Sequence, residues 1–510
     1  MQIDRDSLLN AAILIVLFAR LFSLAVLPEA AYADSFRHVM ISQDIMNYGT
    51  LDMADNIDSP LWWVPPPLYY LVFSSVFFLT GLPIGQYIIK ILPLFFAVVQ
   101  LLLFFLVSRK LFAENWKVPF ALFAAFPLVI RYGSVNYAEN LALIFVLACT
   151  LLALRIRDAR KPVTLLSLVP LAFCLGALSI SKLNGAVLVP FLAAAAYYLL
   201  KNGAGKKTAA IFIIFSALLS SAWFAANYVK YGYADRSFYI SPALHETGES
   251  DLSLLSALPQ NLAMLASSPE MLSAGFVQFW DFPPFGLLPE QFLPALVLAF
   301  ALVVLPLYYA LFTGALSAAR TKRFFFALGA LATAAIAVMV IARTIDLWYF
   351  RLLFPIVPFI AILFGYGWLE LRKNKTAQRL VFLALMLFAL YSFAYTSYTA
   401  IYYANDQANS ASLYAQIALL PEDAKIAIQP NLLHAVNFIS GRDAIWKEIG
   451  FSASSATELH AKLLSFGVTH LATVCRKDPW DKEMLAELQS EGKLRLLFRE
   501  NCSALYGVVK

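Results

Sequence analysis

Apolar segments long enough to cross a bilayer recur along most of this chain, between Leu8 and Tyr402. A helix of about 20 apolar residues spans the roughly 30 Å of hydrocarbon in a membrane. Of the 510 residues, 61% are hydrophobic and only 14% are charged, whereas a soluble domain carries about 25% charged residues. Lipid must therefore solvate much of the surface, and the sequence predicts a polytopic integral membrane protein.

Eleven segments are predicted to span the membrane as helices. They lie near residues 8–28, 86–108, 118–133, 137–156, 163–181, 184–200, 208–230, 291–316, 324–342, 349–370 and 378–402. A further apolar stretch, 68–80, follows Pro65, Pro66 and Pro67 and is shorter, which is typical of a re-entrant or interfacial segment. We therefore expect it to belong to a large first loop.

Lysine and arginine gather in every second loop of this scheme. These basic loop residues are Arg109, Lys110, Lys117, Arg155, Arg157, Arg160, Lys161, Lys201, Lys206, Lys207, Arg320, Lys322, Arg323, Arg372, Lys373, Lys375 and Arg379. Loops rich in Lys and Arg stay in the cytoplasm, so the N-terminus is predicted to be cytoplasmic. The other loops, of which 29–85 and 231–290 are the largest, then face the outside of the plasma (cytoplasmic) membrane.

The composition changes after residue 404, where charged residues become regular and apolar runs shrink to strand length. Strand patterns at 425–429, 469–474, 494–498 and 504–509 alternate with helical patterns near 431–439, 456–466 and 480–491. We expect a transmembrane domain over 1–404 and a small soluble α/β domain over 405–510. With an odd number of spans, this second domain lies outside the cytoplasm, where Cys475 and Cys502 can form a disulfide.

The sequence gives little support for a nucleic-acid partner or for a bound cofactor. The net charge of +6 is spread among loops, so the sequence does not predict a nucleic-acid partner. The C-terminal segment contains no cluster of metal-ligating residues, no nucleophile elbow and no Gly-rich phosphate loop. No cofactor is implied, and a divalent metal is possible but not indicated.

Ionisable and polar residues collect where several predicted helices reach the outer surface. They are Asp34, Lys90, Arg131, Asn136, Glu139, Lys182, Arg343, Asp346 and Arg351, with Arg20 deeper in the first helix. A Lys or Arg at such a position can simply extend to the lipid head groups, and Arg20 can belong to a buried ion pair. Carboxylates gain nothing from anionic lipids, however, and charges at membrane depth are costly and usually functional.

This set of residues fits the transfer of a sugar from a polyprenyl phosphate. The lipid tail stays in the bilayer, so the phosphate and the anomeric carbon must react at the interface. Lys and Arg would stabilise the charge that grows on the leaving phosphate, and a carboxylate would accept the proton of the acceptor hydroxyl. Direct displacement with one such base inverts the anomeric centre.

Four local patterns then carry a resemblance over about residues 1–400. The first is an acidic residue, Asp34, followed by a helix that ends at Asn47-Tyr48-Gly49 and by the proline-rich Pro66-Pro67-Leu68-Tyr69-Tyr70. The second is the basic turn Ser108-Arg109-Lys110-Leu111-Phe112, and the third is Lys182 in SKLNG. The fourth is Trp348-Tyr349-Phe350-Arg351 before Leu353-Phe354-Pro355. In this order they resemble the C-type membrane glycosyltransferases (GT-C). Most similar are the dolichyl-phosphate-mannose protein mannosyltransferases and the bacterial aminoarabinose and related undecaprenyl-phosphate-sugar transferases.

The resemblance implies Asp34 as the catalytic base, with Lys182 and Arg351 on the donor phosphate and Glu139 as a second acidic position. Further residues predicted to bind substrate are Arg343, Tyr349, Lys90, Arg20 and Asn136. Ser35 stands where many members have Glu after the first Asp, and Val64-Pro65 where many have His or Lys before the paired prolines. The oligosaccharyltransferases fit less well, because Val64 and Pro65 follow Trp62-Trp63 in place of a WWD-type signature, so their metal requirement is not carried over.

The predicted partners are therefore a polyprenyl-phosphate-linked sugar donor, an acceptor that is a protein, lipid or glycan, and the bilayer. Two alternative functions remain: a polymerase or ligase of lipid-linked glycans, and a transporter or flippase for them. A transporter usually shows internal repeats and broken helices near the midplane, and neither is evident here. The residues do not specify the sugar, the polyprenol or a bacterial as opposed to an archaeal source.

Overall fold

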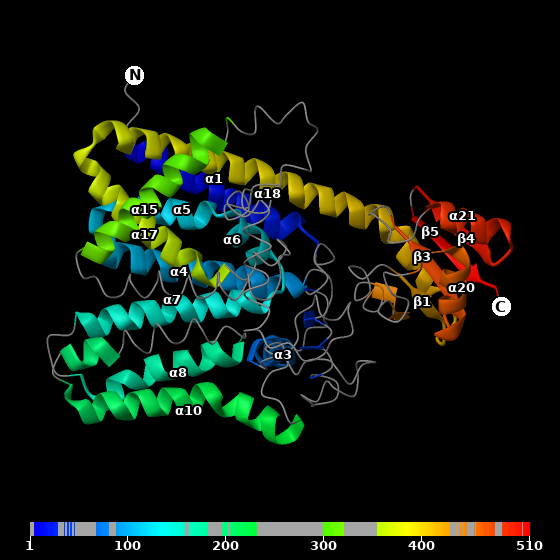
Figure 1. The fold of residues 1–510 in the computed structure, drawn as a ribbon, viewed down its shortest axis with the longest axis horizontal. Coiled ribbons are helices and arrows are strands. Elements are labelled where there is room, and N and C mark those ends of the chain that lie inside the picture. Colours follow the sequence, from blue (N-terminus) through cyan, green and yellow to red (C-terminus); the bar gives the residue numbers. More distant parts are fainter. Residues whose placement is uncertain are drawn as a thin grey trace.

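A computed structural model of the 510-residue chain describes a helical bundle joined to a small sheet domain (Figure 1). It describes residues 5–28, 68–80, 88–158, 163–181, 196–201, 204–231, 300–320, 354–428, 442–445, 455–474, 482–501 and 503–509, with single residues between them at 35, 38, 39, 41, 42, 45, 298, 436, 439, 440 and 453.

Seven helices in the described part of the chain are long and apolar enough to cross a membrane. They are built from α1 (Arg5–Val26), α4 (Ile91–Phe112), α7 (Ala138–Arg157), α10 (Gly205–Tyr231), α15 (Leu305–Arg320), α17 (Val357–Glu370) and α18 (Lys375–Ala418). Short 3₁₀ or π segments adjoin them: η2 (Ile88–Lys90), η3 (Ala113–Asn115), η8 (Phe300–Val304) and η10 (Leu371–Lys373). Each of the seven matches a predicted span, which confirms a multi-pass membrane protein.

The other predicted spans have different outcomes. The segment predicted at 163–181 forms α8 (Leu165–Ser181), an apolar helix of 17 residues. Most of 184–200 and all of 324–342 lie outside the described residues. The stretch at 68–80 forms α3 (Leu68–Thr80), whose 13 residues extend only about 20 Å and fall short of a bilayer.

The span predicted at 118–133 is not one helix. It consists of α5 (Lys117–Ala125), α6 (Pro127–Arg131) and the 3₁₀ turn η4 (Tyr132–Ser134). Phe126 adopts an extended conformation between the two helices, because a proline disfavours helical geometry in the residue before it and Pro127 supplies no N–H. The Ser392 hydroxyl of α18 donates to the carbonyl oxygen of Ala125, so this backbone acceptor is paired within the protein and not left to lipid.

The described helices pack in two groups. In one, α1, α5, α15, α17 and α18 contact one another, and in the other α4, α7, α8 and α10 follow in a row (Figure 1). The two groups share a core that includes Phe104, Phe123, Phe364 and Phe388. Lipid tails do not favour one apolar neighbour over another, so close backbone approach is a main source of helix association in membranes.

Two glycines permit the tightest of these helix contacts. A Cβ atom at Gly314 of α15 would overlap the carbonyl oxygen of Leu363, and one at Gly367 of α17 would overlap the carbonyl oxygen of Ala310. Ala310 and Gly314 are four residues apart on α15, which is the small-residue spacing of close helix crossings, and they face the backbone of α17 at Leu363 and Gly367. The approach of α15 to α17 therefore depends on the absence of side chains at these positions.

The two ends of the bundle differ in charge. We call one end, where α1 and α18 begin and α4 and α7 finish, the basic end. There Lys110 lies 2.9 Å from Asp158, and Lys117 lies 2.9 Å from Asp6. Hydrogen bonds from Arg157 and Lys110 hold the pKa of the Asp158 carboxyl below its ordinary value. Because α1 and α18 run in the same direction, their later turns meet again at the opposite end, which we call the polar end.

The helix α18 connects the bundle to the C-terminal sheet. Its 44 residues extend about 66 Å, roughly twice the thickness of the hydrocarbon. It continues through the predicted domain boundary at 404/405, and its last turns supply Leu413, Tyr414 and Ile417 to a core shared with Ile426 of the sheet. Figure 1 shows the sheet domain beyond the polar end of the bundle.

A five-stranded mixed sheet forms the C-terminal domain, in the order β2-β1-β3-β5-β4. The strands are β1 (Lys425–Ala427), β2 (Asp443–Ile445), β3 (His470–Thr473), β4 (Leu494–Glu500) and β5 (Ser503–Val508), with helices α20 (Ala456–Ser465) and α21 (Lys482–Ser490). β1 pairs in parallel with β2 and β3, while β5 pairs antiparallel with β3 and β4. The predicted small α/β domain is thus present; β2 was not expected, and Cys475 and Cys502 lie outside the described residues.

Candidate active site

A chain of buried polar side chains links three helices at the polar end. Arg20 of α1 donates from Nη2 to Oε1 of Gln100 in α4, at 2.5 Å. The Gln100 amide then donates to the backbone oxygen of Asn140 at 2.9 Å and to its side-chain oxygen at 3.1 Å. Because all three side chains are 0–2% exposed, this chain of hydrogen bonds fixes the guanidinium within the protein interior.

Asn140 also holds the turn that precedes α7. Its side-chain amide donates to the backbone oxygens of Tyr132 and Val135, at 2.9 and 3.0 Å. Backbone groups outside a helix need partners when lipid surrounds the protein, and this amide supplies two of them. The irregular segment between α6 and α7 is therefore held rigidly beside Arg20.

The next two predicted residues, Asn136 and Lys90, join this turn to neighbouring elements. The backbone N–H of Asn136 donates to the Ser35 hydroxyl at 3.1 Å, and its side-chain amide donates to the backbone oxygen of Ile89 at 2.9 Å. Tyr69 of α3 donates to its side-chain oxygen at 3.3 Å. The Lys90 ammonium donates to backbone oxygens of Leu27 (2.6 Å) and Ser134 (3.2 Å), contacts that stabilise the local structure.

Arg20 has donor capacity that the described protein groups do not use. It lies about 9 Å before the end of α1 at Val26, at 1.5 Å per residue. Its side chain is 2% exposed, and among the described residues Nε and Nη1 have no hydrogen-bond partner. A buried guanidinium without such partners is costly. The arrangement is therefore suited to bind an anion, to which the unused N–H groups of the guanidinium would donate charge-assisted hydrogen bonds.

Gly133 makes room for this guanidinium. A Cβ atom at position 133 would lie 2.7 Å from Nη2 of Arg20. The backbone of the turn thus approaches the Arg20 side chain as closely as a glycine allows, and Oε1 of Gln100 accepts a hydrogen bond from the same Nη2.

Two more charged residues lie near this turn. Glu139 is 1% exposed and lies in the first turn of α7, where the helix dipole stabilises a negative charge. Arg131 donates to the Tyr395 hydroxyl of α18 at 3.0 Å, and its guanidinium lies 5.3 Å from the centre of that ring. A carboxylate and cations from different helices are therefore found at the same end of the bundle.

A histidine packed among tyrosines lies next to the Asn136 contacts. His38 Nδ1 is 2.8 Å from the Tyr70 hydroxyl, and the ring centroids of Tyr69 and Tyr137 lie 5.5 and 5.8 Å from that of His38. The pattern LYY after the prolines was singled out in the sequence, whereas His38 was not. A histidine shortly after an acidic residue at a helix end is the signal that would have drawn attention to it.

Comparison with solved structures identifies the architecture. ArnT from Cupriavidus metallidurans in the apo state matches with a TM-score of 0.57 and 13% identity, over 98% of each chain. The same protein bound to undecaprenyl phosphate matches with a TM-score of 0.56 and 13% identity, again over 98% of each chain. The Archaeoglobus fulgidus oligosaccharyltransferase tethered with an acceptor peptide has a TM-score of 0.52 and 12% identity, over 91% of this chain and 69% of its own.

The chain has the GT-C fold. No protein-family model and no curated protein matches its sequence, so the likeness to GT-C proteins is one of three-dimensional structure. Since the match to ArnT covers 98% of both chains, the shared fold includes the C-terminal sheet domain as well as the bundle.

Within this GT-C fold, four of the predicted site residues come together at the polar end: Arg20, Lys90, Asn136 and Glu139. Asp34, Lys182, Arg343, Tyr349 and Arg351 lie outside the described residues, so their roles stay predictions. Gln100 and Asn140 were missed. The signal for Gln100 was its isolation in the apolar run LFFAVVQLLLFF, since a polar side chain within a membrane helix is usually functional.

Proposed function

We propose that this GT-C protein is a glycosyltransferase that transfers a monosaccharide from a polyprenyl-phosphate donor to a protein, lipid or glycan acceptor, with inversion of the anomeric centre. One observation carries the proposal: the buried Arg20 guanidinium, whose Nε and Nη1 lack hydrogen-bond partners within the described part of the chain. The phosphate of the donor is the anion that would use these donors.

The chemistry of the donor fits this position. A polyprenyl phosphate keeps its tail in the bilayer, and Arg20 lies only about 9 Å inside the end of α1. The structure of ArnT bound to undecaprenyl phosphate supports a donor of this class for the shared fold. As the bond between C1 and the phosphate oxygen breaks, Arg20 would stabilise the charge that develops on the leaving group.

The acceptor oxygen must lose its proton as it bonds to C1, and we propose Asp34 as the base that takes it. Ser35, the next residue in the sequence, accepts a hydrogen bond from the backbone of Asn136 at 3.1 Å, which supports a role for this stretch at the polar end. Lys182 and Arg351 are proposed to bind the same phosphate, with Arg343, Tyr349 and Lys90 near the donor. Glu139 is proposed to orient the sugar or acceptor.

The proposed location follows from the distribution of charge. The basic end, which includes Lys110, Lys117 and Arg372, would face the cytoplasm, and the polar end would face the outer surface of the plasma membrane. Transfer would then take place outside the cytoplasm. The domain 405–510 would lie on the same side as the site, joined to it through α18.

The test is the substitution Asp34→Asn in the purified full-length protein. Release of undecaprenyl phosphate would be followed from a panel of undecaprenyl-phosphate-linked sugars, and binding of undecaprenyl phosphate would be measured separately. An amide keeps the shape of the carboxylate but accepts no proton, so transfer should cease while binding is retained. Asp158→Asn at the basic end is the matched control, and turnover at the wild-type rate in Asp34→Asn would remove this residue from catalysis.

The proposed phosphate contacts have a different expected result. Lys182→Ala and Arg351→Ala should each weaken the binding of undecaprenyl phosphate itself, whether or not a sugar is attached. Unchanged affinity in both variants would place the phosphate elsewhere.

A further inference from the structure

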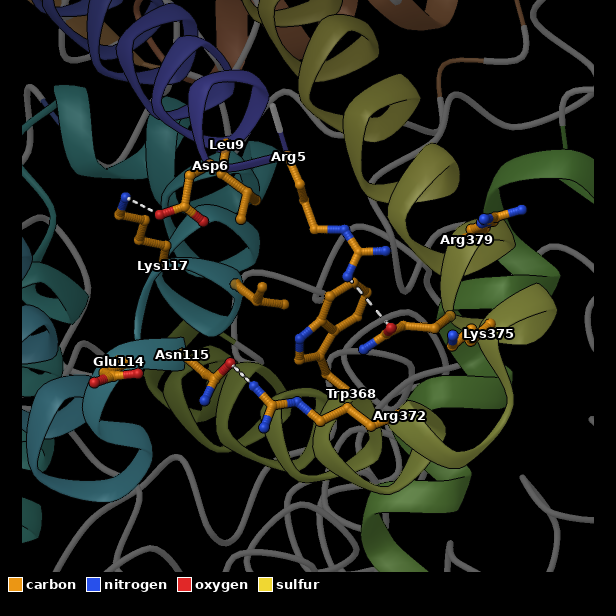
Figure 2. Close-up of a pocket in the computed structure, with 12 residues that line it drawn as sticks. Arg5, Asp6, Leu9, Glu114, Asn115, Lys117, Trp368, Arg372, Lys375 and Arg379 are labelled. Carbon is orange, nitrogen blue, oxygen red and sulfur yellow. Dashed lines mark hydrogen bonds and ion pairs between the residues drawn. The ribbon is translucent and has the colours of Figure 1, made fainter. Parts of the chain in front are cut away.

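A polar cavity lies at the basic end, remote from Arg20. Its volume is ≈ 410 Å³, within the range of about 300–1,000 Å³ typical of small-ligand pockets. It is formed where the start of α1, the α4–α5 connection and the α17–α18 connection meet (Figure 2). Its charged lining residues are Arg5, Asp6, Glu114, Lys117, Arg372, Lys375 and Arg379.

The charge of this cavity is positive. Asp6 is paired with Lys117 at 2.9 Å, which leaves four basic side chains and one carboxylate, Glu114, among the charged lining residues. The accumulation of Lys and Arg on the cytoplasmic side of membrane proteins explains why basic residues are present here. It does not explain why residues from three distant segments converge on one cavity.

Two of the arginines are held in place by protein contacts. Figure 2 shows Arg5 extending from α1 over Trp368, with its guanidinium 5.3 Å from the centre of that ring, a cation–π contact. The same side chain donates to the buried Gln378 at 3.3 Å, and Arg372 donates to Asn115. A preorganised guanidinium loses less conformational entropy on binding a ligand.

The remaining basic residues connect the cavity to the lipid-facing surface of α18. Lys375, Arg379 and Leu383 follow at intervals of four residues and therefore lie on one face of the helix. Lys375 and Arg379 are exposed, and Leu383 is 55% exposed. The basic residues that could contact a lipid head group are therefore directly followed along α18 by an apolar residue that could contact an acyl chain. The positive end of the α18 dipole adds to the attraction for an anion.

We propose that this cavity binds the phosphate head group of an anionic phospholipid, with the acyl chains along α18. Basic pockets between membrane helices on the cytoplasmic side are suited to such head groups. The site is separate from the proposed transferase site, and only the choice of leaflet depends on the proposed orientation. Inorganic phosphate shares the charged chemistry but lacks the chains that would contact Leu383.

The experiment measures binding to the purified full-length protein by native mass spectrometry and by the rise in melting temperature. The probes are phosphatidylglycerol, phosphatidylcholine and inorganic phosphate. The test variant is Lys375→Gln/Arg379→Gln, whose side chains are exposed. Arg5→Gln/Arg372→Gln is a second variant, and Lys206→Gln/Lys207→Gln is the control because it removes the same charge from exposed positions at the start of α10.

Phosphatidylglycerol should bind the wild type and the control equally, and phosphatidylcholine should bind neither tightly. Since each basic residue near a membrane surface changes affinity by about fivefold, the double variants should bind phosphatidylglycerol roughly 30-fold more weakly. If the substitutions weaken stabilisation by inorganic phosphate to the same extent, and phosphatidylglycerol stabilises the protein no further than phosphate does, the cavity binds anions but the lipid assignment is overturned. Equal loss in the control variant, or no binding of either anion to the wild type, would overturn the site itself.

Discussion

Replacement of Arg20 by methionine separates a binding role from a structural one. The guanidinium is 2% exposed, has one hydrogen bond to Gln100 at 2.5 Å and has two nitrogens without partners among the described residues. If its function is to stabilise the fold, its removal should lower the melting temperature. If it binds the donor phosphate, the main loss should be in affinity.

The magnitude follows from the unused donors. A hydrogen bond to a charged group contributes about 1.5–3 kcal/mol, so two bonds to a phosphate correspond to at least ~3 kcal/mol, or ~100-fold in affinity. Removal of a buried, incompletely paired charge relieves its desolvation cost, which offsets the ~1–3 kcal/mol lost when Oε1 of Gln100 is left without its donor. We therefore expect Arg20→Met to bind undecaprenyl phosphate ~100-fold more weakly with an unchanged or higher melting temperature.

The assay is titration of the purified protein with undecaprenyl phosphate, together with thermal unfolding without ligand. Arg20→Lys, which keeps the charge but loses the planar set of guanidinium donors, should give an intermediate affinity. Lys110→Met removes one positive charge at the basic end and should leave affinity unchanged. A lower melting temperature with wild-type affinity in Arg20→Met would refute the assignment of this side chain to the phosphate.

Three further outcomes are expected. Gly133→Ala should displace the Arg20 guanidinium, because the new Cβ would lie 2.7 Å from Nη2. We expect kcat/KM to fall by about tenfold, which corresponds to about 1.4 kcal/mol, with little change in folding. A normal kcat/KM would show that the position of the guanidinium is not critical. Gly314→Val should separate α15 from α17 and lower stability by about 1–3 kcal/mol, as overpacking does, measured by thermal unfolding; an unchanged melting temperature would contradict the close crossing. Burial lowers the pKa of His470 below its ordinary value, so the unfolded chain takes up a proton at a higher pH than the folded protein does, and stability falls as the pH drops below about 6.5. His470→Gln should reduce this pH dependence, measured by unfolding at a series of pH values. An unchanged pH profile would show that His470 does not contribute to it.

The positions of the membrane helices could be predicted because each span is encoded by its own composition. α1, α7 and α10 begin and end within a few residues of the predicted limits. The break at Phe126 shows where this local rule fails. The apolar run continues through Pro127, and the carbonyl of Ala125 finds its partner in Ser392, 267 positions later in the chain.

The candidate site was predictable in kind but not in arrangement. Polar and ionisable residues near the outer ends of the predicted helices marked Arg20, Lys90, Asn136 and Glu139, because such groups are rare at membrane depth. The amides that hold them were not recognised: Gln100 is 80 positions from Arg20, and Asn140 is 40 positions from Gln100. A hydrogen bond between distant segments has no signature in a single sequence.

The C-terminal domain shows the same division. Alternating apolar residues predicted four of the five strands, whereas the order β2-β1-β3-β5-β4 came only from the structure. The last turns of α18 were assigned to the soluble domain by composition, yet they continue the final membrane helix and pack in the core of the sheet domain.

By itself, then, the sequence determined which segments are long and apolar enough to enter lipid and which loops are basic, since these depend on transfer of each segment from water to the bilayer. The tertiary structure alone decided which helices are neighbours. Apolar faces are nearly equivalent in lipid, so neighbours are selected by close packing at residues such as Gly314 and Gly367 and by buried hydrogen bonds such as that between Arg20 and Gln100.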